Sequence, residues 1–198
     1  MQKPADTSVP IHALLRERWS PRAFLERAVE PEVLTSLFEA ARWAPSCFNA
    51  QPWTYLVGTS ADPEGHARLA RCLVEGNAWA HAAPVLACAC AQEAFERNGK
   101  PNAWAWHDVG LASMSLVVQA QSHGLVSHQM AGFDPERTRA ELAIPEGWTP
   151  VAFVALGYPG DAASLPAPLD EREGAPRDRK PLSAVYRGPR WDADPQGG

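Results

Sequence analysis

Hydrophobic residues near the start of the chain recur at the spacing of short amphipathic helices. We expect a first helix in which Ser8 is the N-cap and Pro10 lies in the opening turn. It is predicted to end near Trp19, because Pro21 disfavours helical conformation in the residue before it. A second helix is predicted to open at residue 31 and to end before residue 45. Its apolar stripe comprises Val33, Leu34, Leu37, Phe38 and Ala41.

Short apolar runs between turn signals predict the strands, and longer periodic segments predict the remaining helices. The predicted strands are residues 53–58, 84–91, 125–130 and 150–158, the second and fourth being buried. The predicted helices are residues 66–75, residues 102–123, and a third that begins with Asp134 as N-cap and Pro135 in the first turn.

The helix predicted over residues 102–123 is the longest, and Gly124 is its expected C-terminal stop. Its centre, residues 111–118, is almost wholly apolar, so we expect it to be deeply buried. From residue 159 onward the chain is proline-rich and charged, and such a segment cannot build a core alone. We therefore expect an extended arm over residues 159–198.

Composition indicates one ordinary globular domain over residues 1–198. The chain has 198 residues, of which 45% are hydrophobic and 21% are charged. Eight tryptophans indicate large apolar surfaces, more than one small chain covers by itself. The four cysteines are too few for a disulfide framework, and Cys88 and Cys90 lie in an apolar run, where free cysteine behaves as a small hydrophobe.

Charge and hydropathy exclude several classes of protein. The formal net charge of −5 argues against a nucleic-acid partner, because proteins that bind nucleic acids are usually basic. No stretch has the apolar length needed to span a bilayer, so we expect no membrane partner. The first ten residues are polar and lack the apolar centre of a signal peptide, which favours a cytoplasmic protein.

The first group of candidate functional residues follows the first helix. Arg18, Ser20 and Arg22 alternate, and in an extended stretch side chains at this spacing share one side. Guanidinium groups bind phosphate through several planar donors, and a serine adds a hydroxyl donor, so the three side chains suit one anion. The alternative interpretation is a solvated charged turn.

The second group is the run Ala-Pro-Ser-Cys-Phe-Asn-Ala-Gln-Pro-Trp over residues 44–53. Short polar side chains between two prolines present donors and acceptors in a fixed array, which suits a planar heterocycle with polar edges. The alternative is a helix-to-strand connection whose serine and asparagine only cap backbone groups.

Other known signals are absent from the sequence. No Gly-x-Gly-x-x-Gly follows a strand, and no Walker phosphate loop is present. His107 and Asp108 are adjacent and so lie on different helix faces, and the histidines and cysteines lack zinc-ligand spacing. We expect no metal. Trp104 and Trp106 either line a lid or pack in a core or dimer interface.

The two groups of candidate functional residues, at residues 18–22 and 44–53, together resemble the motifs of the nitroreductase family. Arg-x-Ser-x-Arg is followed by a helix ending in Ala-Ala-Arg-x-Ala-Pro-Ser and then by Asn-x-Gln-Pro-Trp, in the order and spacing of that family. The resemblance continues to the C-terminal region. It implies an α+β fold with a central, mainly antiparallel sheet flanked by helices. It also implies an intertwined homodimer with FMN at the subunit interface.

The resemblance assigns cofactor roles to both motifs. Arg18 and Ser20 would bind the FMN phosphate and ribityl chain, Trp19 would contribute its backbone, and Arg22 would reach the pyrimidine edge of the flavin. Many relatives have serine where this chain has Cys47, for which a nucleophilic role is the less favoured alternative. The loop of residues 45–51 from the other subunit would contact the flavin through Ser46, Cys47, Asn49 and Gln51.

Three further segments are implied to lie near FMN. Asn77 resembles an asparagine beside the flavin ring, with a helix C-cap as the equal alternative. In the family, a basic residue before a Pro-Leu pair returns to the FMN phosphate. We assign this role to Arg179, with Lys180 as second choice. His128 is a candidate proton donor, although a structural histidine is the more common case. The strand and turn against the flavin comprise His128, Gln129, Met130, Ala131 and Gly132.

The implied activity is an oxidoreductase with a ping-pong cycle. Hydride would pass from NADH or NADPH through FMN to a nitroaromatic, a quinone or a similar small-molecule acceptor. The alternatives are a flavin-destructase or dehalogenase branch of the same fold, and a flavin-binding storage or regulatory protein with little turnover. Acceptor choice would depend on loops over the flavin, within residues 95–106.

Overall fold

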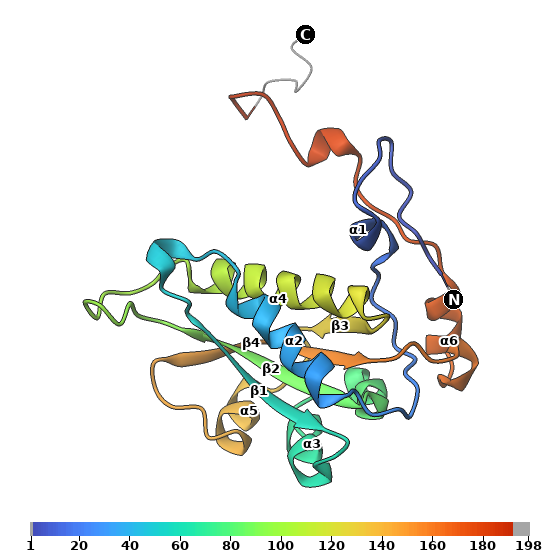
Figure 1. The fold of residues 1–198 in the computed structure, drawn as a ribbon, viewed down its shortest axis with the longest axis horizontal. Helices are drawn as coiled ribbons and strands as arrows, with labels where there is room; N and C mark the ends of the chain where they lie inside the picture. Colours follow the sequence, from blue (N-terminus) through green and yellow to red (C-terminus); the bar gives the residue numbers. More distant parts are fainter. Residues whose placement is uncertain (1, 192–198) are drawn as a thin grey trace.

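A computed structural model describes residues 2–191 of the chain (Figure 1). Within these residues, four strands form an antiparallel sheet in the order β1-β2-β4-β3. Their bounds are Trp53–Thr59 for β1, Val85–Gln92 for β2, Val126–Met130 for β3 and Trp148–Gly157 for β4. All four coincide with predicted strands, and the expected α+β class with an antiparallel sheet is confirmed.

Helices cover both faces of the sheet, which explains why the central strands are buried (Figure 1). Helices α2 (Pro31–Arg42) and α4 (Ala105–Ser122) pack on one face against alternate residues of β2 and β4. Helices α3 (Pro63–Ala70) and α5 (Pro135–Glu141) pack on the other. Strand β2 is apolar at nearly every position because neither of its faces contacts water.

Two helices begin at the same local signal, an aspartate followed by proline. The Asp62 carboxylate accepts from the Gly65 amide at 3.1 Å, and the Asp134 carboxylate accepts from the Arg137 amide at 2.9 Å. The start predicted at Asp134 is confirmed. The helix predicted over residues 66–75 begins three residues earlier and ends at Ala70, and the 3-10 turns of η2 (Glu75–Ala82) follow it.

The first helix is shorter than predicted. Helix α1 spans Ala13–Glu17 and is capped by the His12 ring, which accepts from the Leu14 amide at 3.3 Å. The expected cap at Ser8 and the expected opening turn at Pro10 are therefore wrong, since both residues precede the helix. Residues 8 and 9 form a bend, and the chain becomes helical only at Ala13.

The prediction for the long helix is right about its end, and its predicted burial holds for one side of the helix only. Helix α4 begins at Ala105, and Gly124 follows it in the left-handed region with φ +71°. Leu116 is fully buried, whereas Met114 is 37% exposed. A helix on the surface of one chain buries one side only, so an apolar residue on the other side stays open unless another molecule covers it.

The C-terminal arm contains more regular structure than an extended segment. It includes η3 (Ala162–Ser164), α6 (Leu169–Gly174) and η4 (Leu182–Ala184). After α6 the chain runs beside the N-terminal segment and away from the sheet (Figure 1). The last seven residues of the predicted arm, 192–198, lie outside the described residues. No helix among residues 2–191 combines the length and hydropathy needed to cross a membrane.

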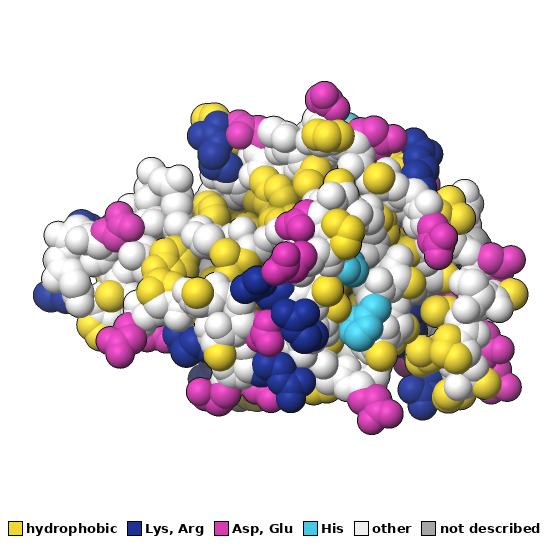
Figure 2. All heavy atoms as spheres, turned by 90° about the horizontal axis from the view of Figure 1, so that it is seen from below, with side chains coloured by type: hydrophobic (Ala, Val, Ile, Leu, Met, Phe, Trp, Pro, Cys, Tyr) yellow, Lys and Arg dark blue, Asp and Glu magenta, His cyan; other side chains and the backbone are white. Residues whose placement is uncertain are grey.

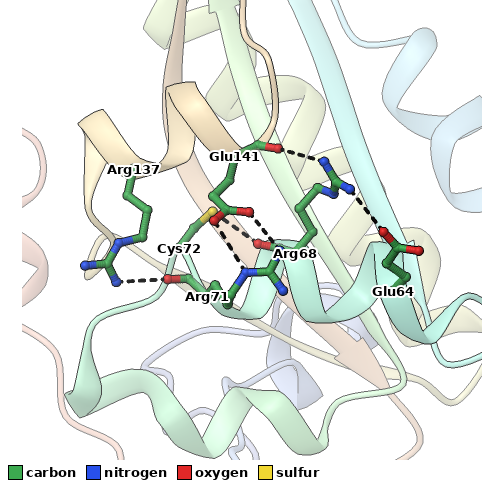
Figure 3. A network of polar contacts seen from close by, with 6 residues as sticks. All are labelled: Glu64, Arg68, Arg71, Cys72, Arg137 and Glu141. Carbon is green, nitrogen blue, oxygen red and sulfur yellow. Dashed lines mark hydrogen bonds and ion pairs between the residues drawn. The ribbon is translucent and has the colours of Figure 1, made fainter.

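The face formed by α3 and α5 carries mixed charges (Figure 2). Arg71 binds both carboxylate oxygens of Glu141, at 2.8 and 3.4 Å, and Arg68 contacts Glu64 and the Glu141 carbonyl (Figure 3). Arg137 donates to the Arg71 carbonyl at 3.2 Å (Figure 3). Hydrogen bonding from Arg71 lowers the pKa of Glu141. These arginines join α3 to α5 and are not a free cationic surface.

Candidate functional site

A cavity of about 920 Å³ lies between the N-terminal segment and the C-terminal arm. Residues 5–15 line one side, residues 177–185 line the other, and Arg18 contributes to the wall. Its apolar part is formed by Val9, Ile11, Leu15, Leu182 and Val185. Segments from opposite ends of the sequence therefore enclose one space.

A cluster of positive side chains lines this cavity. Arg18 donates to the Ser20 hydroxyl at 3.3 Å, which holds the two predicted anion ligands together. Burial lowers the pKa of Arg18, and the charges of Arg177 and Arg179 lower it further. Among residues 2–191, none of these three guanidiniums forms an ion pair, and Lys180 adds a fourth cation to the lining. Crowded, unpaired guanidiniums suit an anion with more than one charge.

Arg177 belongs to this cluster and was missed in the sequence. Its guanidinium donates to the carbonyls of Lys3 at 2.6 Å and Arg16 at 3.1 Å, so it fixes the arm to the N-terminal segment. The signal was present, because Arg177 and Arg179 have the alternate spacing that singled out Arg18 and Ser20. Arg179 donates to the carbonyl of Asp178 at 2.6 Å.

Glu173 holds the segment that follows Arg18. Its side chain, 2% exposed, accepts from the amides of Arg22 at 2.7 Å and Ala23 at 3.3 Å. The Arg22 guanidinium lies 3.4 Å from the same carboxylate and 5.8 Å from the Trp79 ring centre. Arg22, which is expected to reach the flavin, is thus oriented by Glu173 of the C-terminal arm. Trp19 stacks under the Lys3 ammonium, 4.6 Å from its ring centre.

The loop between Pro45 and Pro52 is closed by its own polar groups. The Ser46 hydroxyl accepts from the Gln51 amide at 3.0 Å, which is the backbone-capping role of the alternative interpretation. The Cys47 amide donates to Asp108 at 2.9 Å. Asp108, 2% exposed, is another functional candidate that the sequence did not reveal. Positive φ values occur at Phe48, Asn49 and Gln51 (54°, 54° and 48°).

The two motifs lie at opposite ends of α4 within one chain (Figure 1). The loop contacts Asp108 in the first turn of the helix. The segment before Arg18 shares a hollow with Gln121 in the last turn. About 20 Å of helix separates these two positions, at 1.5 Å rise per residue. A single chain does not bring the motifs together.

Asn77 contacts the turn after β3. It lies inside η2, so the C-cap interpretation is wrong, and its amide donates to the Gly132 carbonyl at 2.9 Å. A Cβ on Gly132 would lie 2.6 Å from the Asn77 amide nitrogen, which explains why glycine stands there. Met130 is buried in the core, whereas Gln129 and Ala131 are exposed. Met130 therefore faces the sheet core with its side chain.

His128 packs as a neutral, structural ring. Its Nδ1 donates to the Pro21 carbonyl at 3.1 Å, and its ring lies 4.6 Å from the ring of Trp79. Burial lowers the pKa of His128, and the charge of Arg22 lowers it further. The carbonyl only accepts, so the proton resides on Nδ1. These contacts give the ring a structural role, and its candidate role as a proton donor stays a prediction.

Solved structures and sequence relatives agree on the fold of this chain. A solved structure described as an oxidoreductase containing FMN is 35% identical, with a TM-score of 0.89 over 96% of each chain. A nitroreductase family protein from Clostridium difficile 630 is 25% identical, with a TM-score of 0.70 over 89% of this chain and 96% of that one.

Among sequence relatives, an NADH dehydrogenase of Thermus thermophilus is 31% identical over 85% of this chain and 91% of its own length. An uncharacterised 15.4 kDa protein of Mycolicibacterium smegmatis is 41% identical over 68% of this chain and 90% of its own. The nitroreductase family model matches residues 15–75 and 64–158. The chain belongs to the nitroreductase family.

The nitroreductase match covers some candidate residues and leaves others outside. Arg18, the loop of residues 45–52, Asn77 and His128 lie inside the matched range, whereas Arg177 and Arg179 follow its end. The similar FMN-containing oxidoreductase is alike over 96% of this chain, which extends the likeness into the arm. The expected nitroreductase-like fold is confirmed.

In this nitroreductase-family protein, we predict that acid destabilises the wild type more than a His128→Gln variant. The folded pKa of His128 lies below its ordinary value of 6.5, so the unfolded chain binds this proton more readily. The stability from the neutral ring is complete above pH 6.5 and is lost as the pH falls through the folded pKa. Urea unfolding from pH 8 to pH 5 measures the free energy of unfolding of the wild type and of His128→Gln. An equal loss of stability in both proteins would contradict the prediction.

Proposed function

We propose that this chain is an FMN-dependent oxidoreductase that uses NADH or NADPH and a small-molecule acceptor. One observation carries the proposal: Arg18, Arg177 and Arg179 crowd one cavity without an ion pair among residues 2–191. Family membership and the similar structure described as an oxidoreductase containing FMN support it.

The donor set fits the phosphate end of FMN. A phosphate monoester carries close to two negative charges at neutral pH, and charge-assisted bonds to guanidinium are among the strongest hydrogen bonds in proteins. Arg18, Ser20 and Arg179 would hold this group, with Lys180 beside them. Burial, and after it repulsion from Arg177 and Arg179, lowers the pKa of Arg18, and an anion there would offset that repulsion.

The protein's own part in the proposed reaction is binding and orientation. When bound, FMN supplies the hydride chemistry, taking reducing equivalents from a nicotinamide and giving them to a nitroaromatic, quinone or similar acceptor in alternation. Arg22 would lie at the pyrimidine edge, held in orientation by Glu173. Asn77 would act beside the ring together with the turn at Ala131 and Gly132, whose small side chains allow close backbone approach.

We further propose that the working unit is a homodimer. The anion cluster and the loop of residues 45–52 lie at opposite ends of α4, so a complete cofactor site requires the loop of a second copy (Figure 1). Exposed apolar side chains after α2, in the loop and along α4 support a surface that a second copy covers. They include Trp43 (75%), Phe48 (73%), Trp104 (58%), Trp106 (57%) and Met114 (37%).

Colour and bleaching test the proposed function. The purified protein, or the protein incubated with excess FMN, is expected to be yellow and to bleach when NADPH or NADH is added without oxygen. Its colour should return on addition of a nitroaromatic or a quinone. A protein that binds FMN but is bleached by neither nucleotide would be a binding protein with little turnover, and one that binds no FMN would overturn the proposal.

A further inference from the structure

A second cavity, of about 450 Å³, lies where the cofactor loop meets the turn that follows β2. Asn49 and Gln51, two residues assigned to the cofactor by family resemblance, are part of its lining. The remaining wall comes from the predicted lid region, residues 95–106. The full lining comprises Phe48, Asn49, Ala50, Gln51, Phe95, Glu96 and Arg97.

Arg97 is a cation with aromatic neighbours and, within the described part of the chain, no ion-pair partner. Its guanidinium lies 4.3 Å from the Phe48 ring centre and 5.3 Å from that of Phe95. The two rings meet edge to face, with centres 6.0 Å apart and planes at 78°. Among residues 2–191, no carboxylate forms an ion pair with Arg97. A guanidinium held on ring faces keeps its edge donors available for an anion.

The backbone fixes both sides of this cavity. The turn is closed by bonds from the Phe95 amide to the Lys100 carbonyl at 2.9 Å and from the Gly99 amide to the Phe95 carbonyl at 2.8 Å. On the other side, Phe48 has a φ of 54°, an unfavourable conformation for a residue with a side chain, and the residue is 73% exposed. Such backbone strain gathers at functional sites.

We propose that this cavity is a subsite that selects ring-shaped acceptors carrying an anionic substituent. The inference rests on the proposed function and names the acceptor class for the same site. The exposed Phe48 ring offers a face for the acceptor ring, and Arg97 offers two parallel donors for a carboxylate. Glu96 lines the cavity with opposite charge and accepts from the side-chain Nε2 of Gln92 at 3.2 Å, so it weakens this preference.

Two acceptors of nearly equal shape test the proposal. We expect Arg97→Gln to lower kcat/KM for 4-nitrobenzoate about fivefold, the upper range for an exposed ion pair, and to leave methyl 4-nitrobenzoate unchanged. Glu96→Gln should shift the preference the opposite way. Lys100→Gln is the matched control, because it removes an equal charge from the same turn outside the cavity lining. An equal change for both acceptors in Arg97→Gln, or none, would overturn the proposal.

Two further measurements separate other outcomes. KM for NADH and for NADPH should not change in Arg97→Gln; a rise there, with acceptor preference intact, would assign the anion to the nicotinamide nucleotide and overturn the acceptor assignment. Saturation-transfer NMR with benzoate and benzyl alcohol on the purified protein needs no turnover, so it decides the matter even if the proposed activity fails. Benzoate contact that is lost in Arg97→Gln and kept in Lys100→Gln supports the subsite, and unchanged contact refutes it.

Discussion

Replacing Arg18 by alanine is expected to weaken FMN binding by about 10- to 100-fold. Arg18 is the guanidinium at the centre of the unpaired cluster, and it also holds the Ser20 hydroxyl at 3.3 Å. A hydrogen bond to a charged group contributes about 1.5 to 3 kcal/mol, which corresponds to this range of affinity. Fluorescence titration of the flavin-free protein with FMN measures the loss, and Arg179→Ala is expected to act in the same direction.

Arg16→Ala is the matched control for this experiment. Arg16 lies two residues from Arg18, but Arg16 lines a different hollow, which it shares with Lys3 and Trp19. The control should therefore keep nearly the wild-type affinity for FMN. Full flavin occupancy in Arg18→Ala, with an affinity equal to that of Arg16→Ala, would show that the phosphate lies elsewhere.

Replacing Glu173 by alanine is expected to lower the free energy of unfolding by about 2 to 4 kcal/mol. The carboxylate is 2% exposed and accepts from the amides of Arg22 and Ala23. Its removal leaves these donors and the Arg22 guanidinium without their acceptor, and removal of one member of a buried pair is strongly destabilising. Arg22 is 27% exposed, so solvent replaces part of what is lost and the estimate stays below the fully buried range.

Two other variants separate the possible causes. Glu173→Gln keeps an oxygen that accepts from the Arg22 amide but removes the charge, so an intermediate loss is expected. Glu171→Ala changes an exposed residue of the same short helix and should alter stability little. Urea unfolding measures all three proteins, and equal stability of Glu173→Ala and Glu171→Ala would contradict the role given to Glu173.

Features that depend on neighbouring residues were predictable from the sequence. Asp134 and Pro135 begin α5 because an aspartate accepts from the amide three residues later and proline suits the first turn. Gly124 ends α4 because it adopts a positive φ at little cost. The motifs after the first helix and after α2 indicated the nitroreductase family, whose match is confirmed. Their roles toward FMN remain predictions.

Features that depend on distant partners were not predictable. Glu173 acts on amides about 150 residues away, and no local pattern distinguishes it from the exposed Glu171 beside it. The same holds for Asp108, whose partner is the Cys47 amide in another segment. A carboxylate is identical in the sequence whether it contacts water or a buried amide, since only the surrounding chain decides which of them it meets.

The sequence by itself determined the succession of strands and helices along the chain, the two cofactor-type motifs and the family. Hydropathy period, capping residues and motif spacing act over a few residues, so the chain carries them without folding. The tertiary structure decided that Arg177 and Arg179 meet Arg18, that Arg97 lies over Phe48, and that the two motifs occupy opposite ends of α4. These depend on how helices pack against the sheet and where the arm returns, which no short segment specifies.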